Sequence, residues 1–168
     1  ISTLIKDGDF DLGIAFDGDA DRLVVLDENG VIIRSDDLMI LFLPEVINER
    51  SKDIVFDVKC SRALEEMIIK YGGNPIMWNT GHSLIKEKMK EEGVNFAGEM
   101  SGHIFFADEY FGYDDALYVA LRVLRIISKG TDSISSLLKD IPKYYSTPEI
   151  RVDCSSDDEK FEITSKIK

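Results

Sequence analysis

Three aspartates, Asp17, Asp19 and Asp21, alternate with the small residues Gly18 and Ala20. In an extended segment this spacing puts the three carboxylates on one side, and the small residues let the backbone curl around an ion. Carboxylates held this close repel one another unless a cation lies among them. Such hard oxygen ligands suit Mg²⁺ or Ca²⁺ better than zinc. We therefore interpret the segment as a divalent-metal loop and not as a solvated acidic turn.

Two other chemistries compete for this loop. An EF-hand loop would have Asp17, Asp19 and Asp21 at its first, third and fifth positions and Glu28 at its twelfth, but Arg22 replaces the required glycine. The flanking segments are also strand-like instead of helical. A haloacid-dehalogenase-type phosphatase begins with a strand and Asp-x-Asp, which would make Asp17 a nucleophile. The loop resembles that class poorly, because Asp21 stands where those enzymes carry Thr or Val.

The elements that must position the loop alternate between strands and helices, which predicts an α/β fold. Short apolar runs, Leu12–Phe16 and Leu23–Leu26, flank the aspartates, and Asn29-Gly30 predicts a turn into a third strand, Val31–Ile33. Later strands are expected at Ile54–Val58, Pro75–Trp78 and Ile104–Ala107.

Helices are expected between these strands and after them. The first should run from Ser35 to Arg50, with an N-cap from the Ser35–Asp37 segment and a kink or break at Pro44. The second should be capped by Ser61 and stopped by Gly72-Gly73. The others are expected at Ser83–Glu92, Asp114–Ser128 and Ser133–Ile141. Spacing in the long fourth helix predicts a core face of Leu117, Ala120, Leu121 and Leu124. Tyr144–Val152 has a strand-like pattern, and Asp153–Lys168 is polar with a helical tendency.

The histidines are placed where loops meet regular elements. The chain has two, His82 and His103, and each follows a glycine. Imidazole can exchange a proton near neutral pH, so this placement favours a functional role for both. Lys59 at a strand end would ordinarily be a solvated surface residue.

Ordered motifs along the chain resemble the α-D-phosphohexomutases, the phosphomannomutase/phosphoglucomutase family. Phe16–Arg22 resembles the metal-binding loop of that family, and four further segments match it in order: Asp57–Arg62, Thr80–Lys86, Gly98–His103 and Tyr110–Tyr118. The resemblance implies a three-layer αβα phosphohexomutase domain with a mixed sheet, an α/β fold, plus partial flanking domains.

The resemblance also implies roles for single residues. Asp17, Asp19 and Asp21 would hold Mg²⁺ beside a phosphoserine, and Arg22 would approach the phosphoryl group, for which its planar donor fork is suited. The other implied residues are Lys59, His82 and His103 as catalytic groups and Glu99, Ser101 and Gly81 as substrate-binding groups. Besides Mg²⁺, glucose 1,6-bisphosphate or mannose 1,6-bisphosphate is implied as activator and intermediate.

The domain organisation implied by the resemblance is incomplete. Residues 1–33 would end domain two, residues 34–142 would form domain three, and residues 143–168 would be a linker and the truncated start of domain four. We expect a fragment of an isomerase, inactive by itself, whose full-length phosphoprotein interconverts hexose 1-phosphate and hexose 6-phosphate with domains one and four of its own chain. Phosphoglucosamine mutase and a non-catalytic divalent-cation-binding module remain alternatives.

The amino-acid composition disfavours some classes of binding partner. The 168 residues carry 20 basic and 32 acidic side chains, a formal charge of −12, which disfavours nucleic acid and anionic membranes. No apolar run is long enough to cross a bilayer. The two cysteines, Cys60 and Cys154, do not make a disulfide framework. These features favour a cytoplasmic protein.

Overall fold

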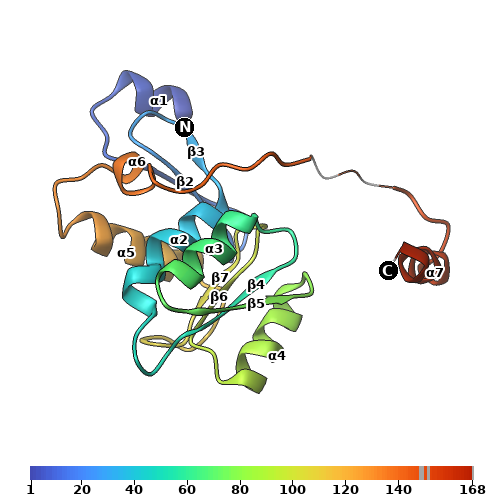
Figure 1. Ribbon diagram of the computed structural model, residues 1–168. Helices are drawn as coiled ribbons and strands as arrows, with labels where there is room; N and C mark the ends of the chain where they lie inside the picture. The colour runs from blue at the N-terminus through green and yellow to red at the C-terminus, as the bar shows by residue number, and fades with distance from the viewer. Residues whose placement is uncertain (148–149, 151, 168) are drawn as a thin grey trace.

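The computed structural model describes residues 1–147, 150 and 152–167. They include two β-sheets with helices packed around them and a last helix that lies away from both sheets (Figure 1). The first sheet contains β1 (Gly13–Phe16), β2 (Leu23–Leu26) and β3 (Ile32–Ile33), all antiparallel. The predicted turn between β2 and β3 is present: Gly30 has φ 71°, and the Asp27 carboxylate accepts the backbone N–H groups of Asn29 and Val31. The β1–β2 connection is the acidic loop.

The second sheet is mixed. Its order is β5-β4-β6-β7, in which β4 (Asp53–Asp57) runs parallel to β5 (Asn74–Trp78) and to β6 (Phe96–Gly98), whereas β7 (Ile104–Phe106) is antiparallel to β6. The β6–β7 connection is a tight turn over residues 99–103, so it lies at the edge of the sheet where the parallel strands end.

Helices cover both faces of the mixed sheet, which confirms the three-layer α/β/α expectation. Along β4, Ile54 and Phe56 face a core shared with α2 (Ser35–Val46) and α3 (Arg62–Lys70), while Val55 faces α4 (His82–Glu92). Figure 1 shows α2 and α3 on one side of this sheet and α4 on the other.

An aromatic cluster forms the centre of the larger core. Phe42 of α2 meets Phe96 of β6 and Phe106 of β7 edge-on, with ring centroids 5.9 and 5.0 Å apart. Leu23 and Val25 of the first sheet belong to the same core. The two sheets therefore share one hydrophobic core, which fixes the acidic loop relative to the mixed sheet.

Two helix ends differ from the predictions. Ser61 caps α3 as expected, accepting the backbone N–H of Ala63. Helix α2 has Arg34 as its N-cap without a side-chain hydrogen bond, so the predicted N-cap is wrong; the Asp36 carboxylate is buried instead. The extension to Arg50 is also wrong, because α2 ends at Val46. Pro44 causes no break, since it lies in the last turn, where it removes a single hydrogen bond.

The predicted core face of α5 (Ala116–Ile127) is largely wrong. Leu117, Leu121 and Leu124 are exposed, and of the predicted set only Ala120 is buried. The buried stripe consists of Ala116, Val119, Ala120 and Val123. Both stripes have helical spacing, and the small alanines let α5 approach β1, β2 and β7 closely.

The ends of the chain also differ from expectation. Helix α1 (Ser2–Asp7) was not predicted, and α6 (Ile134–Leu137) is shorter than the predicted helix. The strand predicted at 144–152 is absent over 144–147, 150 and 152, and its other residues lie outside the described part. Helix α7 (Asp157–Ile167) agrees with the helical tendency predicted there. No helix among the described residues has the length and apolar character that crossing a membrane requires.

Replacing Phe42 with alanine in the 168-residue chain is expected to lower the free energy of unfolding by about 3–5 kcal/mol, because it removes the ring that joins two strands to α2. Urea unfolding followed by circular dichroism measures the change. Leu117→Ala is the matched control on an exposed helix face, for which we expect a change within about 0.5 kcal/mol. Equal losses in the two variants would contradict the assigned core.

Candidate functional site

The acidic loop brings its three carboxylates together. One oxygen each from Asp17, Asp19 and Asp21 lies within 4.8 Å of the others. Ala20 between them has φ 59°, a left-handed conformation that is uncommon for residues other than glycine. Its carbonyl accepts the backbone N–H of Ala116 at 3.0 Å, so the start of α5 holds the loop in this shape.

The loop fits a hard divalent cation. Asp21 Oδ1 is buried and has no hydrogen-bond partner. Burial raises the pKa of Asp21, the neighbouring charges of Asp19 and Asp17 raise it further, and His103 only partly opposes them. A dication between the carboxylates would relieve both the desolvation and the repulsion.

Arg22 lies against this loop. Its Nε is 3.3 Å from Asp17 Oδ2 and 3.6 Å from Asp21 Oδ1, and its backbone N–H donates to Asp17 Oδ1. About half of the Arg22 side chain is exposed. The guanidinium therefore neutralises part of the loop and keeps donors free toward solvent.

A fully buried carboxylate connects three loops at the end of β4. Asp57 Oδ1 accepts the Cys60 thiol at 3.1 Å and the Met100 backbone N–H at 3.2 Å, and its Oδ2 accepts the Thr80 hydroxyl at 3.2 Å. Burial, followed by the charge of Asp57, raises the pKa of Cys60 far above its usual range. Lys59 Nζ is 3.9 Å from Asp57 Oδ2, and the lysine side chain is partly exposed.

The β6–β7 turn contains two of the three predicted substrate-binding residues, Glu99 and Ser101, which differ in exposure. Glu99 is buried, and its Oε1 accepts the backbone N–H of Gly81 at 2.7 Å. Ser101 is exposed. Glu99 thus fixes the loop that precedes His82, a structural role that the sequence did not predict.

Close backbone contact joins this turn to the acidic loop. The Gly102 carbonyl accepts the Leu23 backbone N–H at 3.2 Å. Gly102 has φ 104°, and a Cβ there would lie 3.2 Å from the Leu23 carbonyl oxygen and 3.3 Å from Arg22 Cβ. This position requires glycine both for its backbone angle and for the narrow space.

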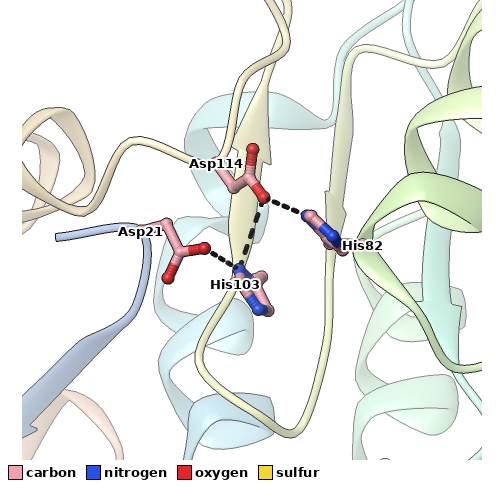
Figure 2. A group of neighbouring side chains, drawn as sticks. All are labelled: Asp21, His82, His103 and Asp114. Atoms are coloured by element: carbon pink, nitrogen blue, oxygen red, sulfur yellow. Dashed lines mark hydrogen bonds and ion pairs between the residues drawn. The ribbon is translucent and has the colours of Figure 1, made fainter. Parts of the chain in front are cut away.

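The two histidines meet at a common carboxylate. Figure 2 shows the His82 and His103 rings directed toward Asp114, with Asp21 on the other side of His103. The rings stack with centroids 5.3 Å apart. His82 Nδ1 is 2.8 Å from Asp114 Oδ2, and His103 Nδ1 is 3.5 Å from the same oxygen and 3.7 Å from Asp21 Oδ2.

Asp114 is a site residue that sequence reasoning missed. The sequence places Asp114 at the start of the predicted helix Asp114–Ser128, but α5 begins at Ala116, and Asp115 caps it by accepting the Tyr118 N–H. The Asp114 carboxylate instead accepts hydrogen bonds from the His82 ring and the Lys86 ammonium group. Burial raises the pKa of Asp114, but the hydrogen bonds from Lys86 and His82 outweigh it and leave the pKa below its usual value. The sequence did contain a signal: two adjacent acids precede this helix, which needs only one cap, so the other acid is available for a different role.

Most predicted site residues thus gather on one edge. The acidic loop, the β6–β7 turn and the start of α4 adjoin one another, whereas Lys59 connects to them only through Asp57. The catalytic and substrate-binding roles of these residues stay predictions.

One sheet edge of this α/β/α domain thus carries the acidic loop, the turn with the buried Glu99 and the two stacked histidines. Residues 34–145 match the family described as phosphoglucomutase/phosphomannomutase, alpha/beta/alpha domain III. Because this match covers more than half of the chain, the chain belongs to the phosphoglucomutase/phosphomannomutase family.

Named relatives agree with this assignment. The chain is 47% identical over 165 residues to a phosphomannomutase/phosphoglucomutase from Pseudomonas aeruginosa; the match includes 98% of this chain and 35% of that protein. It is 39% identical over 166 residues to a phosphomannomutase from Methanocaldococcus jannaschii, with 98% of this chain and 36% of that protein matched. A crystal structure of a phosphoglucomutase/phosphomannomutase family protein from Burkholderia thailandensis has a TM-score of 0.80 and 46% identity, covering 86% of this chain and 31% of that one. The chain therefore spans about a third of the length of these relatives.

Asp57→Asn is expected to destabilise the 168-residue chain by about 1–3 kcal/mol, because an amide cannot accept from all three donors around this buried side chain. Asp53→Asn, at the partly exposed start of the same strand, is the matched control, and we expect a change within about 0.5 kcal/mol because its amide oxygen can still accept from Asn74. Thermal or urea unfolding measures both. A loss in the control as large as that in Asp57→Asn would contradict the connecting role of Asp57.

Proposed function

We propose that this chain supplies the metal and sugar loops of a phosphohexomutase that interconverts hexose 1-phosphates and hexose 6-phosphates. The observation that carries the proposal is the convergence of two independent motifs: His103 of the sugar turn lies 3.7 Å from Asp21 of the metal loop. A non-catalytic cation module would need the loop but would have no use for the turn beside it.

The relatives support the same activity. Several are named for phosphomannomutase, phosphoglucomutase or both. Two more distant relatives of similar fold, both N-acetylphosphoglucosamine mutases from Aspergillus fumigatus, were solved in complex with GlcNAc-6P and magnesium and with glucose 1,6-bisphosphate. These ligands match the Mg²⁺ and the 1,6-bisphosphate that we propose for the full-length protein.

Charge neutralisation is the contribution we propose for the acidic loop. Mg²⁺ held by Asp17, Asp19 and Asp21 would stabilise negative charge on a phosphoryl group in transfer. Arg22 projects free N–H donors beside the loop and would bind phosphoryl oxygens. The phosphoserine that gives and receives this group would come from a part of the protein outside this chain.

Proton transfer and sugar binding fall to the neighbouring loops. His82, paired with Asp114, and the buried His103 are the candidates for moving a proton at the sugar hydroxyl, with Lys59 at the next loop. Ser101 is exposed to a ligand, while Glu99 uses Oε1 on Gly81 and has Oε2 left to accept a sugar hydroxyl. The sugar must bind in two orientations, so that either phosphate reaches the serine.

The remaining domains of the protein complete this proposal. We propose that residues 1–33 end domain two, 34–142 form domain three and 143–168 lead into domain four, and that the chain alone is inactive. The hexose phosphate would then bind between this chain and domains one and four. A cytoplasmic location is consistent with a sugar-phosphate substrate.

Asp19→Ala in the full-length protein is expected to lower kcat at least about 100-fold, because it removes a ligand of the ion that neutralises the transferring group. Phosphoglucomutase and phosphomannomutase assays with Mg²⁺ and glucose 1,6-bisphosphate measure the loss. Asp11→Ala, an exposed acid just before β1, is the control and should keep wild-type activity.

Either of two results would contradict this function. Full activity of Asp19→Ala would remove the metal role from the loop. A wild-type protein inactive on both sugars would redirect the assay to glucosamine phosphate, or to a non-catalytic relative.

Ser101→Ala is expected to raise KM for hexose phosphate about 2–10-fold, the effect of one lost hydrogen bond, and to leave Mg²⁺ affinity unchanged. Glu99→Gln tests the second residue, since an amide oxygen can still accept the Gly81 N–H and so preserves the loop. Ser128→Ala, at the far end of α5, is the control. Unchanged kinetics in both test variants would contradict the sugar-turn assignment.

A further inference from the structure

A second group of ligand atoms lies beside the acidic loop. One atom each from Asp21, His82, His103 and Asp114 lies within 4.8 Å of all the others. They come from the acidic loop, the start of α4, the β6–β7 turn and the segment before α5 (Figure 2). Four elements distant in sequence thus direct donor atoms to one point.

One member of this group lacks a hydrogen-bond partner. The His103 side chain is 8% exposed, and its Nδ1 is a buried atom without a hydrogen bond. Buried polar groups are nearly always paired, so an unpaired imidazole nitrogen facing two carboxylates points to a ligand between them.

The spacing fits a four-coordinate ion. Ligands about 2.0–2.2 Å from a tetrahedral zinc ion lie about 3.3–3.5 Å from one another. The separations involving Asp114 Oδ2 are 2.8 Å to His82 Nδ1 and 3.5 Å to His103 Nδ1, and His103 Nδ1 is 3.7 Å from Asp21 Oδ2. These three separations differ from the tetrahedral value by at most about 0.7 Å, and all four atoms lie within 4.8 Å of one another, so modest side-chain movements would bring them into coordination.

We propose that Asp21, His82, His103 and Asp114 form a second metal site, selective for zinc-like transition ions over Mg²⁺. Imidazole nitrogen suits zinc, whereas the all-oxygen loop suits Mg²⁺. Two carboxylates and two neutral imidazoles balance the charge of a dication. Three of these residues also have roles in the proposed activity, but metal binding alone tests the site, so its failure and the failure of that activity can be told apart.

Lys86 supports the geometry from outside the cluster. Its Nζ donates to Asp114 Oδ1 at 2.9 Å, which leaves Oδ2 directed at the histidines. The backbone of Asp114 is held by a bridge to Phe105. Such outer partners orient metal ligands and contribute to affinity. The His82 side chain is 49% exposed, which gives an ion access from solvent.

The new site and the acidic loop share Asp21. Two dications a few ångströms apart repel each other, and each would compete for the same carboxylate. Zinc at the histidine site therefore weakens binding of Mg²⁺, or of its spectroscopic substitute Mn²⁺, at the loop.

The test uses the intact protein after metal removal with EDTA. Co²⁺ replaces zinc, which has no visible spectrum, and zinc affinity is measured by competition with a coloured chelator. The wild-type protein should give the intense visible bands of four-coordinate Co²⁺. His82→Ala should lose these bands and at least about tenfold in zinc affinity. Because His82 is half exposed, this variant should fold, and unchanged Mn²⁺ binding confirms that it does.

Asp19→Ala is the matched control from the loop: it should lose Mn²⁺ affinity and keep the Co²⁺ bands. Saturating zinc should also lower Mn²⁺ affinity in the wild type. The proposal is overturned if the wild type shows only the weak bands of six-coordinate Co²⁺, if His82→Ala binds zinc as tightly as the wild type, or if Asp19→Ala alone abolishes zinc binding. Mn²⁺ affinity unaffected by bound zinc would overturn the sharing of Asp21.

Discussion

The burial of Asp57 is the constraint on which the rest of the site depends. A carboxylate without solvent exposure is costly unless donors surround it, and here the donors come from three separate loops. Because the buried carboxylate needs all of these donors, the Cys60, Thr80 and Met100 segments must lie against the same side chain. Glu99 is a second buried acid of this kind: it accepts the Gly81 N–H and thereby fixes the start of α4. The buried acids Asp57 and Glu99 therefore organise this edge.

A second constraint comes from the close approach of the two sheets. The contact of Gly102 with Leu23 allows no side chain at the glycine, and Ala116 holds the acidic loop from the other side. Because Leu23 and Val25 also belong to the core of the mixed sheet, the acidic loop cannot move independently of the β6–β7 turn. Residues 1–33 therefore pack as one body with the domain that follows, and the distance between Asp21 and His103 is set by core packing.

The sequence was a good guide wherever local rules decide the outcome. Most of the strands, the Asn29-Gly30 turn and the Ser61 cap depend on side-chain alternation, backbone angles and a neighbouring hydroxyl, all of which can be recognised locally. The short strand β6 was not predicted, and the strand predicted at 144–152 is absent from the described residues of that range. The face of α5 could not be predicted, because Leu117 and Val119 both lie on stripes of helical period and only the approach of the sheet selects between them. The acidic loop and both histidines were found by residue type and motif. Their convergence was not, since it depends on contacts between distant segments.

Two adjacent acids, Asp114 and Asp115, make different contacts, which explains why residue type alone could not define this site. Asp115 accepts a helix N–H, as a cap should, and Asp114 next to it turns toward the histidines because its backbone is bridged to Phe105. The same chemical group therefore serves as a helix cap at Asp115, a histidine partner at Asp114 and a loop connector at Asp57. What distinguishes these roles is the set of donors around each carboxylate: a helix N–H at Asp115, a ring nitrogen and an ammonium group at Asp114, and donors from three loops at Asp57.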